Sequence, residues 1–363
     1  MPEPLRVAYT LEQCWHDVPG GSAVAALEVY HRLRRRSTDR GDVDMVAVAG
    51  RHRASPAPPF RPDGQVHALP LARPWLYETW NRWGWPLVEA STGPVDVCHS
   101  TIAIPAATAS PHVVTVHDVA FVHAPDRFSK QGVRVMRRGL ERSRDADLVL
   151  CPSRATQADL VGLEFDPARI RVVPWGVEPI AISQRELDRV RSELALPGEF
   201  VLFVGTIEPR KNLGGLLDAM RSVPDLPLVI AGAAGWGDAL PVDVRPDAVR
   251  FLGFVRPADL RPLMQAATVF AYPSYEEGFG LPILEAMAQG TPVVTSRGSA
   301  TEEVAGGAAV LADPADPASI AEAIRHVLAD RDRWSLAARE RAAACTWEST
   351  VDATVTAYRE VAS

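Results

Sequence analysis

The sequence has few cysteines, and their spacing fits neither a disulfide framework nor a metal site. There are four, at Cys14, Cys98, Cys151 and Cys345, and no two form a CxxC pair. Reduced thiols of this kind indicate a cytoplasmic protein. Long apolar runs are also missing, since none approaches the ~18–20 residues that a membrane span needs. The charged, proline-containing start does not resemble a signal peptide.

An excess of basic charge is missing too, because the formal net charge is −7 at pH 7. This balance argues against general nucleic-acid binding. The basic segment 31–36 ends an expected helix, where the helix dipole favours cations, so a solvated helix end is its simplest interpretation. Contact with an acidic partner or a membrane surface is the alternative. At 363 residues, the chain is long enough for two globular domains.

The dinucleotide fingerprint GxGxxG is absent, although the chain begins with the elements that usually surround it. An apolar strand at Leu5–Thr10 is followed by a loop with Gly20 and Gly21. A helix to about Arg34 comes next, with Ser22 as its expected N-cap. Strand, glycine turn and helix are typical of a Rossmann-like domain. Without the fingerprint and its acid, a nicotinamide oxidoreductase is not favoured.

What the sequence does contain is an alternation of strand and helix patterns through both halves. Strands are expected at residues 5–10, 42–48, 65–71, 95–99, 112–116, 148–150, 200–204, 228–232, 249–253, 268–272, 291–296 and 309–311. The alternation predicts an α/β fold with two domains that face each other across a cleft. Residues 178–186 are expected to form the linker between the two domains.

The stretch from residue 272 to residue 296 reads as strand, glycine loop, helix, turn and strand. Gly278 and Gly280 permit a sharp turn or a close approach to a ligand, and a helix N-terminus follows them. That N-terminus favours an anion, yet Glu277 and Glu285 flank the loop. A ligand with a central phosphate and hydroxyl groups at both ends, such as a nucleotide sugar, explains both features. The alternative is that Glu285 merely suits a helix N-terminus and Glu277 is solvated.

A second loop carries the counter-charge for such a phosphate. Arg210 and Lys211 follow the expected strand at 200–204 and precede a helix from about Leu213. Cations are unfavourable at the positive end of a helix by about 0.3–1 kcal/mol each, so a polyphosphate shared with that helix would explain them. Two solvated cations on a loop are the alternative.

Two features of the first half have both a functional and a structural interpretation. His117 ends the strand at 112–116, where α/β sheets bind ligands, but a buried and satisfied histidine would also fit there. Four tryptophans gather in segment 75–90 and offer either a platform for a sugar acceptor or ordinary core packing. They are Trp75, Trp80, Trp83 and Trp85.

Together these motifs resemble the retaining glycosyltransferases of family 4. The donor motif of that family is matched by Glu277, Gly278, Phe279, Gly280, Leu281, Pro282 and Glu285. The resemblance implies the GT-B architecture, with two Rossmann-like domains. Residues 1–180 would bind the acceptor, together with a C-terminal helix at 346–363 that crosses back to them. Residues 181–345 would bind the nucleotide-sugar donor.

The resemblance also implies roles for individual residues. The expected catalytic residues are His117, Lys211 and Glu277. Lys211 would stabilise the leaving diphosphate, Glu277 would hold the donor sugar, and His117 would support the orientation of that sugar. Glu285 would hold the ribose. The expected donor-binding residues are Gly21, Arg210, Lys211, Val255, Glu277, Gly278, Phe279, Gly280, Leu281 and Glu285. Thr206 stands where many members have arginine, which leaves the role of Arg210 open.

No metal and no cofactor are expected. Asp-x-Asp triplets occur at residues 42–44, 145–147 and 330–332. The first two lead into strands at the end opposite to a ligand site, and the third joins two helices, so all three are interpreted as structural. The resemblance implies a metal-independent enzyme that retains the anomeric configuration, by front-face transfer through an oxocarbenium-like state.

The identity of the substrates stays open. The segment 208–212 resembles members that act on mannose, which favours GDP-mannose slightly over UDP- and dTDP-hexoses. The acceptor would be a glycan, a lipid-linked molecule or a small molecule. A cytoplasmic location is expected, and peripheral contact with the inner membrane face is left open. The alternative functions are a nucleotide-sugar-binding protein and an NDP-sugar epimerase, neither of which transfers to an acceptor.

Overall fold

The computed structural model describes residues 4–16, 19–232 and 248–363, which divide into two compact units. The first unit extends to Trp175 and also contains Trp347–Ser363, and the second is Gly176–Thr346. The boundaries expected from the sequence follow residues 180 and 345. Within the described residues, no helix is long and apolar enough to cross a membrane.

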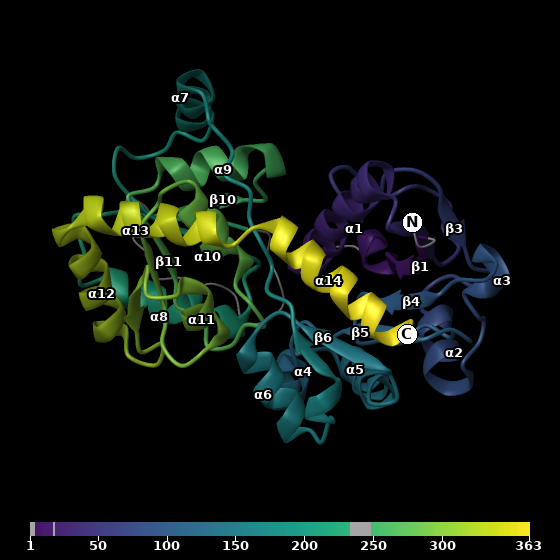
Figure 1. Cartoon of the computed structure of the whole chain (residues 1–363). Helices are drawn as coiled ribbons and strands as arrows, with labels where there is room; N and C mark the ends of the chain where they lie inside the picture. The colour runs from purple at the N-terminus through teal and green to yellow at the C-terminus, as the bar shows by residue number, and fades with distance from the viewer. Residues whose placement is uncertain (1–3, 17–18, 233–247) are drawn as a thin grey trace. The chain divides into compact units, whose positions relative to one another are not determined.

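The first unit is built on a parallel sheet of seven strands among the described residues. The strands are β1 (Leu5–Thr10), β2 (Val43–Ala49), β3 (Val66–Ala68), β4 (Val97–Ser100), β5 (His112–Thr115), β6 (Leu148–Cys151) and β7 (Ile170–Val172). Their order across the sheet is β3-β2-β1-β4-β5-β6-β7 (Figure 1). Its first six strands follow the doubly wound order of a Rossmann fold, which confirms the predicted fold class for this half.

Helices connect these strands, as parallel pairing requires. They are α1 (Gly21–Arg40), α2 (Trp75–Trp83), α3 (Glu89–Thr92), α4 (Ala120–His123), α5 (Lys130–Ser143) and α6 (Arg154–Gly162), with 3-10 turns at Glu12–Trp15, Pro125–Arg127 and Pro167–Arg169. The expected N-cap of α1, Ser22, is wrong. The backbone of Gly20 takes the extended cap conformation and Gly21 is already helical. Glycine serves as an N-cap at little cost, so the cap lies two residues before the serine and the helix begins one residue before it.

The last helix of the chain, α14 (Trp347–Val361), belongs to the first unit and contacts α1 and β5 (yellow in Figure 1). Tyr358 lies on it, and its hydroxyl is 2.7 Å from Nδ1 of His99 in the core. The other ring nitrogen of His99 lies 2.7 Å from the hydroxyl of Thr115 on β5. Complete burial lowers the pKa of His99 to about 3, so the ring is neutral. A polar chain therefore joins α14 to the sheet.

The second unit has a parallel sheet of six strands among the described residues. They are β8 (Val201–Val204), β9 (Leu228–Ala231), β10 (Val249–Gly253), β11 (Val269–Tyr272), β12 (Val293–Ser296) and β13 (Val310–Ala312). Their order is β10-β9-β8-β11-β12-β13. Strands β8, β9, β11 and β12 are buried or nearly so along their whole length, as expected for parallel strands covered by helices on both faces.

The helices of this unit include one that lies where a linker was expected. They are α7 (Gln184–Glu193), α8 (Leu213–Met220), α9 (Pro257–Ala266), α10 (Leu281–Ala288), α11 (Ala300–Ala305), α12 (Pro317–Ala329) and α13 (Arg331–Ala344), with a 3-10 turn, η4, at Pro209–Lys211. The expected linker 178–186 is wrong at its end, because α7 begins inside it. Ser183 and Glu186 form a reciprocal capping box there, which satisfies the first free amides of the helix.

Replacement of Tyr358 by phenylalanine tests the polar chain between α14 and the sheet. Loss of the hydroxyl leaves Nδ1 of His99 buried without its partner, so the free energy of unfolding should fall by about 1–3 kcal/mol in urea denaturation. Thr356→Ala on the same helix is the control, because that side chain is exposed and should change stability by less than about 0.5 kcal/mol. Equal stability of the two variants would contradict this role of Tyr358.

Candidate active site

The loop between β8 and α8 holds Arg210 and Lys211 on the turn η4. Asn212 fixes the end of this loop with a backbone φ of +55°. Its side-chain amide donates to the carbonyl oxygens of Pro273 (3.0 Å) and Pro314 (2.6 Å), which follow β11 and β13. Three segments that are far apart in the sequence therefore meet at the carboxyl edge of the sheet, the usual ligand edge of such folds.

The side chain of Lys211 is buried, yet none of the acids that the structure describes is bonded to its charge. Only 8% of the residue is exposed, and the ammonium lies 5.9 Å from the centre of the Tyr272 ring. Across the described part of the chain, the ammonium makes no hydrogen bond and no ion pair. Burial lowers the pKa of Lys211, although Glu277 acts in the opposite direction. At Gly205 a Cβ would lie 2.8 Å from the Lys211 nitrogen, so glycine leaves room for the ammonium.

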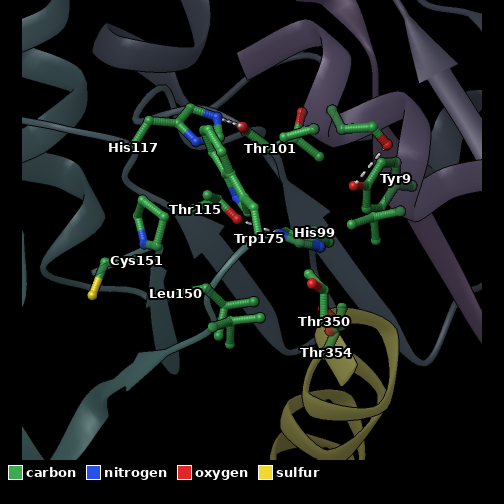
Figure 2. A pocket seen from close by; sticks show the side chains of 15 residues that line it. Tyr9, His99, Thr101, Thr115, His117, Leu150, Cys151, Trp175, Thr350 and Thr354 are labelled. Carbon is green, nitrogen blue, oxygen red and sulfur yellow. Dashed lines mark hydrogen bonds between the residues drawn. The ribbon is translucent and has the colours of Figure 1, made fainter. Parts of the chain in front are cut away.

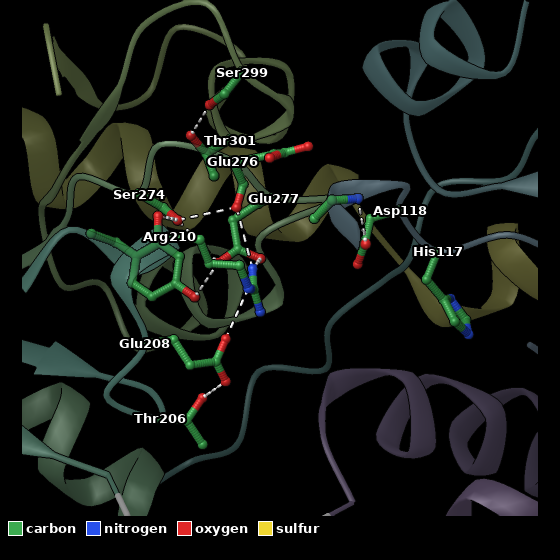
Figure 3. Close-up of polar contacts among 12 residues, drawn as sticks. His117, Asp118, Thr206, Glu208, Arg210, Ser274, Glu276, Glu277, Ser299 and Thr301 are labelled. Atoms are coloured by element: carbon green, nitrogen blue, oxygen red, sulfur yellow. Dashed lines mark hydrogen bonds and ion pairs between the residues drawn. The ribbon is translucent and has the colours of Figure 1, made fainter. Parts of the chain in front are cut away.

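Arg210 is engaged by two acids of the same unit (Figure 3). Its guanidinium lies 2.8 Å from Oε2 of Glu277 and donates to Oε2 of Glu208 at 2.9 Å. It also donates to the carbonyl oxygen of Glu276 at 3.2 Å. All three charged side chains are at least four-fifths buried. Arg210 is therefore bonded within the protein, in contrast to its neighbour Lys211.

Glu277 is held by hydroxyl groups as well as by Arg210. The hydroxyls of Tyr272 (2.8 Å) and Ser274 (3.2 Å) both donate to Oε1, while Oε2 faces the guanidinium. Burial alone would raise the pKa of Glu277, but Arg210 and Lys211 bring it below its ordinary value. The carboxylate is therefore ionised at neutral pH and fixed in orientation.

Sequence reasoning missed the roles of Glu208, Tyr272 and Ser274. Thr206, which stands where many family members have arginine, donates its hydroxyl to Glu208. That contact orients the second acid on Arg210. The sequence offered one signal for Glu208, which is an acid two residues before Arg210. It does not show which acids a given arginine contacts in the fold.

The glycine loop of the donor motif leads into α10 as predicted. Gly280 has a φ of +102°, a left-handed conformation that favours glycine, and it forms the N-cap of the helix. On either side of it, Phe279 and Leu281 are buried. Gly278 lies in the loop before them, and Glu285 is half-buried on α10.

The structure brings Arg210, Lys211 and Glu277 together, but not every predicted residue is in contact with them. Val255 is buried between β10 and α9. Gly21 is the exposed first residue of α1 in the other unit, and a Cβ there would meet no atom within 4 Å. The donor-binding roles of these residues stay predictions.

His117 follows β5 in the first unit and lines a cavity of about 30 Å³, room for one or two waters (Figure 2). Its Nε2 lies 2.8 Å from the carbonyl oxygen of Thr101 and therefore carries the proton. Nδ1 is a buried acceptor with no partner among the described residues. The ring of Trp175 packs edge-on against the imidazole at 5.3 Å. Burial lowers the pKa of His117, so the ring is neutral at pH 7.

The four tryptophans of segment 75–90 divide into one core residue and three surface residues. Trp80 is 2% exposed and donates to the carbonyl oxygen of Pro86 at 3.0 Å. Trp75, Trp83 and Trp85 are 69%, 71% and 52% exposed. Core packing is therefore the correct interpretation for Trp80 and wrong for the other three.

The Asp-x-Asp triplets have structural partners. Asp42 forms an ion pair with Arg36 at 2.9 Å. Asp147 accepts the backbone N–H of His112 at 2.7 Å, and the triplet at 330–332 lies at the start of α13. These contacts agree with a structural interpretation, and a reaction without metal stays a prediction.

Two family models match the chain, one after the other. Residues 19–180 match Glycosyltransferase Family 4, and residues 184–343 match glycosyl transferases group 1. The O-antigen chain mannosyltransferase B of Escherichia coli is 36% identical over 271 residues, which cover 68% of this chain and 70% of that protein. The chain belongs to glycosyltransferase family 4. This family 4 member is therefore an enzyme that transfers glycosyl groups, as the resemblance implied.

A further relative agrees with this family, and solved structures share its fold. A D-inositol 3-phosphate glycosyltransferase of Geodermatophilus obscurus is 38% identical over 218 residues, 54% of this family 4 chain and 48% of that protein. A sucrose-phosphate synthase from Thermosynechococcus elongatus has a TM-score of 0.73 at 22% identity, covering 99% of this chain and 98% of that one. HepE of Anabaena, solved with UDP and glucose, has a TM-score of 0.68 at 20% identity, with the same coverage. These likenesses confirm the GT-B fold.

Replacement of Arg210 by alanine tests the internal pairing in this family 4 enzyme. Glu277 and Glu208 would lose their common cation, and the free energy of unfolding should fall by about 3–5 kcal/mol at pH 7. The loss should shrink at acid pH: the folded-state pKa of Glu277 is lowered, so its stabilising contribution disappears as pH falls through that pKa.

The matched control is Arg221→Ala. Arg221 pairs with Asp218 at 3.6 Å, and the two side chains are 70% and 61% exposed. An exposed pair of this kind contributes about 0–1 kcal/mol. A similar small loss for Arg210→Ala in urea denaturation would contradict the buried pairing.

Proposed function

We propose that this glycosyltransferase moves a hexose, with mannose favoured, from a nucleotide-diphosphate sugar to a hydroxyl of its acceptor. The anomeric configuration would be retained, and no metal ion would take part. The observation that supports this most strongly is the buried ammonium of Lys211, which has no bonded anion among the described residues. A buried charge without a partner is costly, and a bound diphosphate would remove that cost.

In this mechanism Lys211 meets the charge that develops on the leaving diphosphate. The C–O bond between the sugar and the diphosphate breaks, and both of its electrons stay with the phosphate oxygen. An ammonium that is already in place needs no reorganisation at that moment. The positive end of the α10 dipole, which begins after Gly280, would stabilise the same anion.

Glu277 would bind a hydroxyl of the donor sugar. Two hydroxyl donors already occupy Oε1, while Oε2 has the Arg210 contact and retains capacity for another donor. A carboxylate held by three partners in a buried network is poorly suited to act as a covalent nucleophile. Front-face transfer is therefore the proposed route to retention. The acceptor oxygen would form its bond to the sugar carbon on the side that the diphosphate leaves, and its proton would pass to the departing phosphate oxygen.

His117 would orient the donor sugar without exchanging a proton. Its Nε2–H is committed to the carbonyl of Thr101, so only Nδ1 is left, and it can accept a hydrogen bond from a sugar hydroxyl. Because burial lowers the pKa of the ring, Nδ1 remains an acceptor at neutral pH.

The donor is proposed from relatives. The Escherichia coli protein is named as a mannosyltransferase, which supports mannose as the transferred sugar. HepE was solved with UDP, which keeps uridine nucleotides beside GDP as donors to be tested. Lys211 and the N-terminal end of the α10 dipole are the groups proposed to replace a metal on the diphosphate.

A cytoplasmic location is proposed from the scattered cysteines of the sequence, and peripheral membrane contact from the surface of the first unit. Trp83 and Trp85 are largely exposed, and α5, which contacts α2, carries Arg134 and Arg138 beside Glu78. Exposed tryptophan next to arginine suits the interface between an anionic membrane and water.

Replacement of Lys211 by methionine tests the proposed function. Release of nucleoside diphosphate should be measured over a panel of GDP-, UDP- and dTDP-hexoses, with and without EDTA. We expect release from one donor to be unaffected by EDTA and to fall about 10²–10³-fold in Lys211→Met. The variant should be at least as stable as the wild type in urea, because it loses a buried charge that has no bonded partner among the described residues.

Lys130→Met is the matched control, since Lys130 is the other lysine of the chain and is exposed at the start of α5. That variant should keep full activity. Activity of Lys211→Met within about tenfold of the wild type would overturn the role of Lys211. Loss of activity in EDTA with recovery in Mn²⁺ would overturn the metal-free reaction.

A further inference from the structure

A second cavity, larger than the one at His117, opens on the first unit. Its volume is about 390 Å³, and it lies between the end of β2, the loop after it and β3. Its lining includes Trp15, His52, Arg53 and Arg61. Since β2 ends at the carboxyl edge of a parallel sheet, the cavity lies at the edge where such folds bind ligands.

The charged side chains that line this cavity are two arginines. None of the lining residues that the structure describes is an aspartate or glutamate, and the carboxylate of Glu12 lies behind the lining on His52. Arg53 and Arg61 are exposed, and neither forms an ion pair with another described residue. In a chain with a net charge of −7, this is a local reversal of sign. Two guanidinium groups facing one cavity suit an anion with several oxygens.

The wall behind the arginines is built from fixed side chains. The rings of Trp15 and His52 stack at 4.5 Å with an angle of 10° between them. Trp15 donates to the carbonyl oxygen of Ala54 at 2.8 Å, and Nε2 of His52 lies 3.0 Å from Oε2 of Glu12. Glu12 is 1% exposed and also accepts the backbone N–H of Gly50 at 2.6 Å. The two rings are therefore held in place before any ligand arrives.

We infer that this cavity binds a phosphate or diphosphate group carried by the acceptor. The inference rests on the proposed function, because it assumes an acceptor for the transferred sugar and states where the phosphate of that acceptor binds. The guanidinium groups of Arg53 and Arg61 donate to the phosphate oxygens, and the Trp15–His52 wall contacts the sugar attached to the phosphate.

The sheet order places the cavity away from His117. Three strand spacings separate β2 from β5 in the order β2-β1-β4-β5, about 14 Å at the usual spacing. The phosphate would thus be held at one end of the acceptor, and the hydroxyl that accepts the sugar would belong to another part of the molecule. This favours an acceptor with more than one sugar ring.

The test is calorimetric titration of the full chain with mannose 6-phosphate and with mannose, at a saturating concentration of UDP or GDP to occupy the donor site. The phosphate form should bind at least about tenfold more tightly. Arg53→Ala combined with Arg61→Ala should abolish that difference. Arg51→Ala removes the same charge from the same loop outside the cavity lining, and it should bind as the wild type does.

A second arm replaces the soluble probe with a sugar joined to a short isoprenyl diphosphate. Tighter binding of this probe than of mannose 6-phosphate, lost in the double variant, would identify a lipid-linked acceptor. Equal binding of mannose and its phosphate, or a double variant that binds either anionic probe like the wild type, would overturn the inference. If the wild type binds the probes through these arginines but releases nucleoside diphosphate from no donor, the proposed function fails while the cavity assignment stands.

Discussion

The buried ammonium of Lys211, which has no bonded anion in the described part of the chain, is the constraint on which the site of the second unit depends. Four charges meet beside β8 and β11, two from Arg210 and Lys211 and two from Glu208 and Glu277. The two positive and two negative charges balance, but Arg210 forms ion pairs with both acids. Lys211 is attracted by the same acids at longer range and, among the described residues, is bonded to neither. Such a site is stable enough to fold and still favours an incoming anion. The pair with Arg210 orients the Glu277 carboxylate, and the two cations lower its pKa and keep it ionised.

Arginine and lysine have different roles in this chain. Its sequence contains only two lysines among 38 basic residues, and one of these is Lys211. Arginines provide the structural pairs, such as Arg36 with Asp42 and Arg189 with Asp259. A planar guanidinium suits fixed, bidentate pairing, whereas an ammonium is a compact charge that can turn toward whatever anion arrives. Arg53 and Arg61 lack protein partners among the described residues, and they line a cavity.

The fold was largely predictable, since buried strands alternating with helices indicate parallel α/β sheets in any chain. Element ends were less predictable: the expected linker 178–186 overlaps the first turn of α7, although the pair Ser183 and Glu186 signals a capped helix there. In the site, the types of charge were predictable but their pairing was not. Arg210 meets Glu277 across 67 positions of sequence, and only the packing of β8 against β11 decides that contact. The outward position of Trp83 depends in the same way on tertiary packing.

The most direct measurement is NMR titration of the protein labelled with ¹³C at lysine Cε. Two lysines give two signals, and Lys130→Arg assigns them. The pKa of Lys211 should lie below the ordinary lysine value in the free protein and should rise when the nucleoside diphosphate of the preferred donor binds, while that of Lys130 stays constant. A pKa of Lys211 that is unaffected by nucleoside diphosphate would contradict the claim that this buried charge is kept for the leaving group.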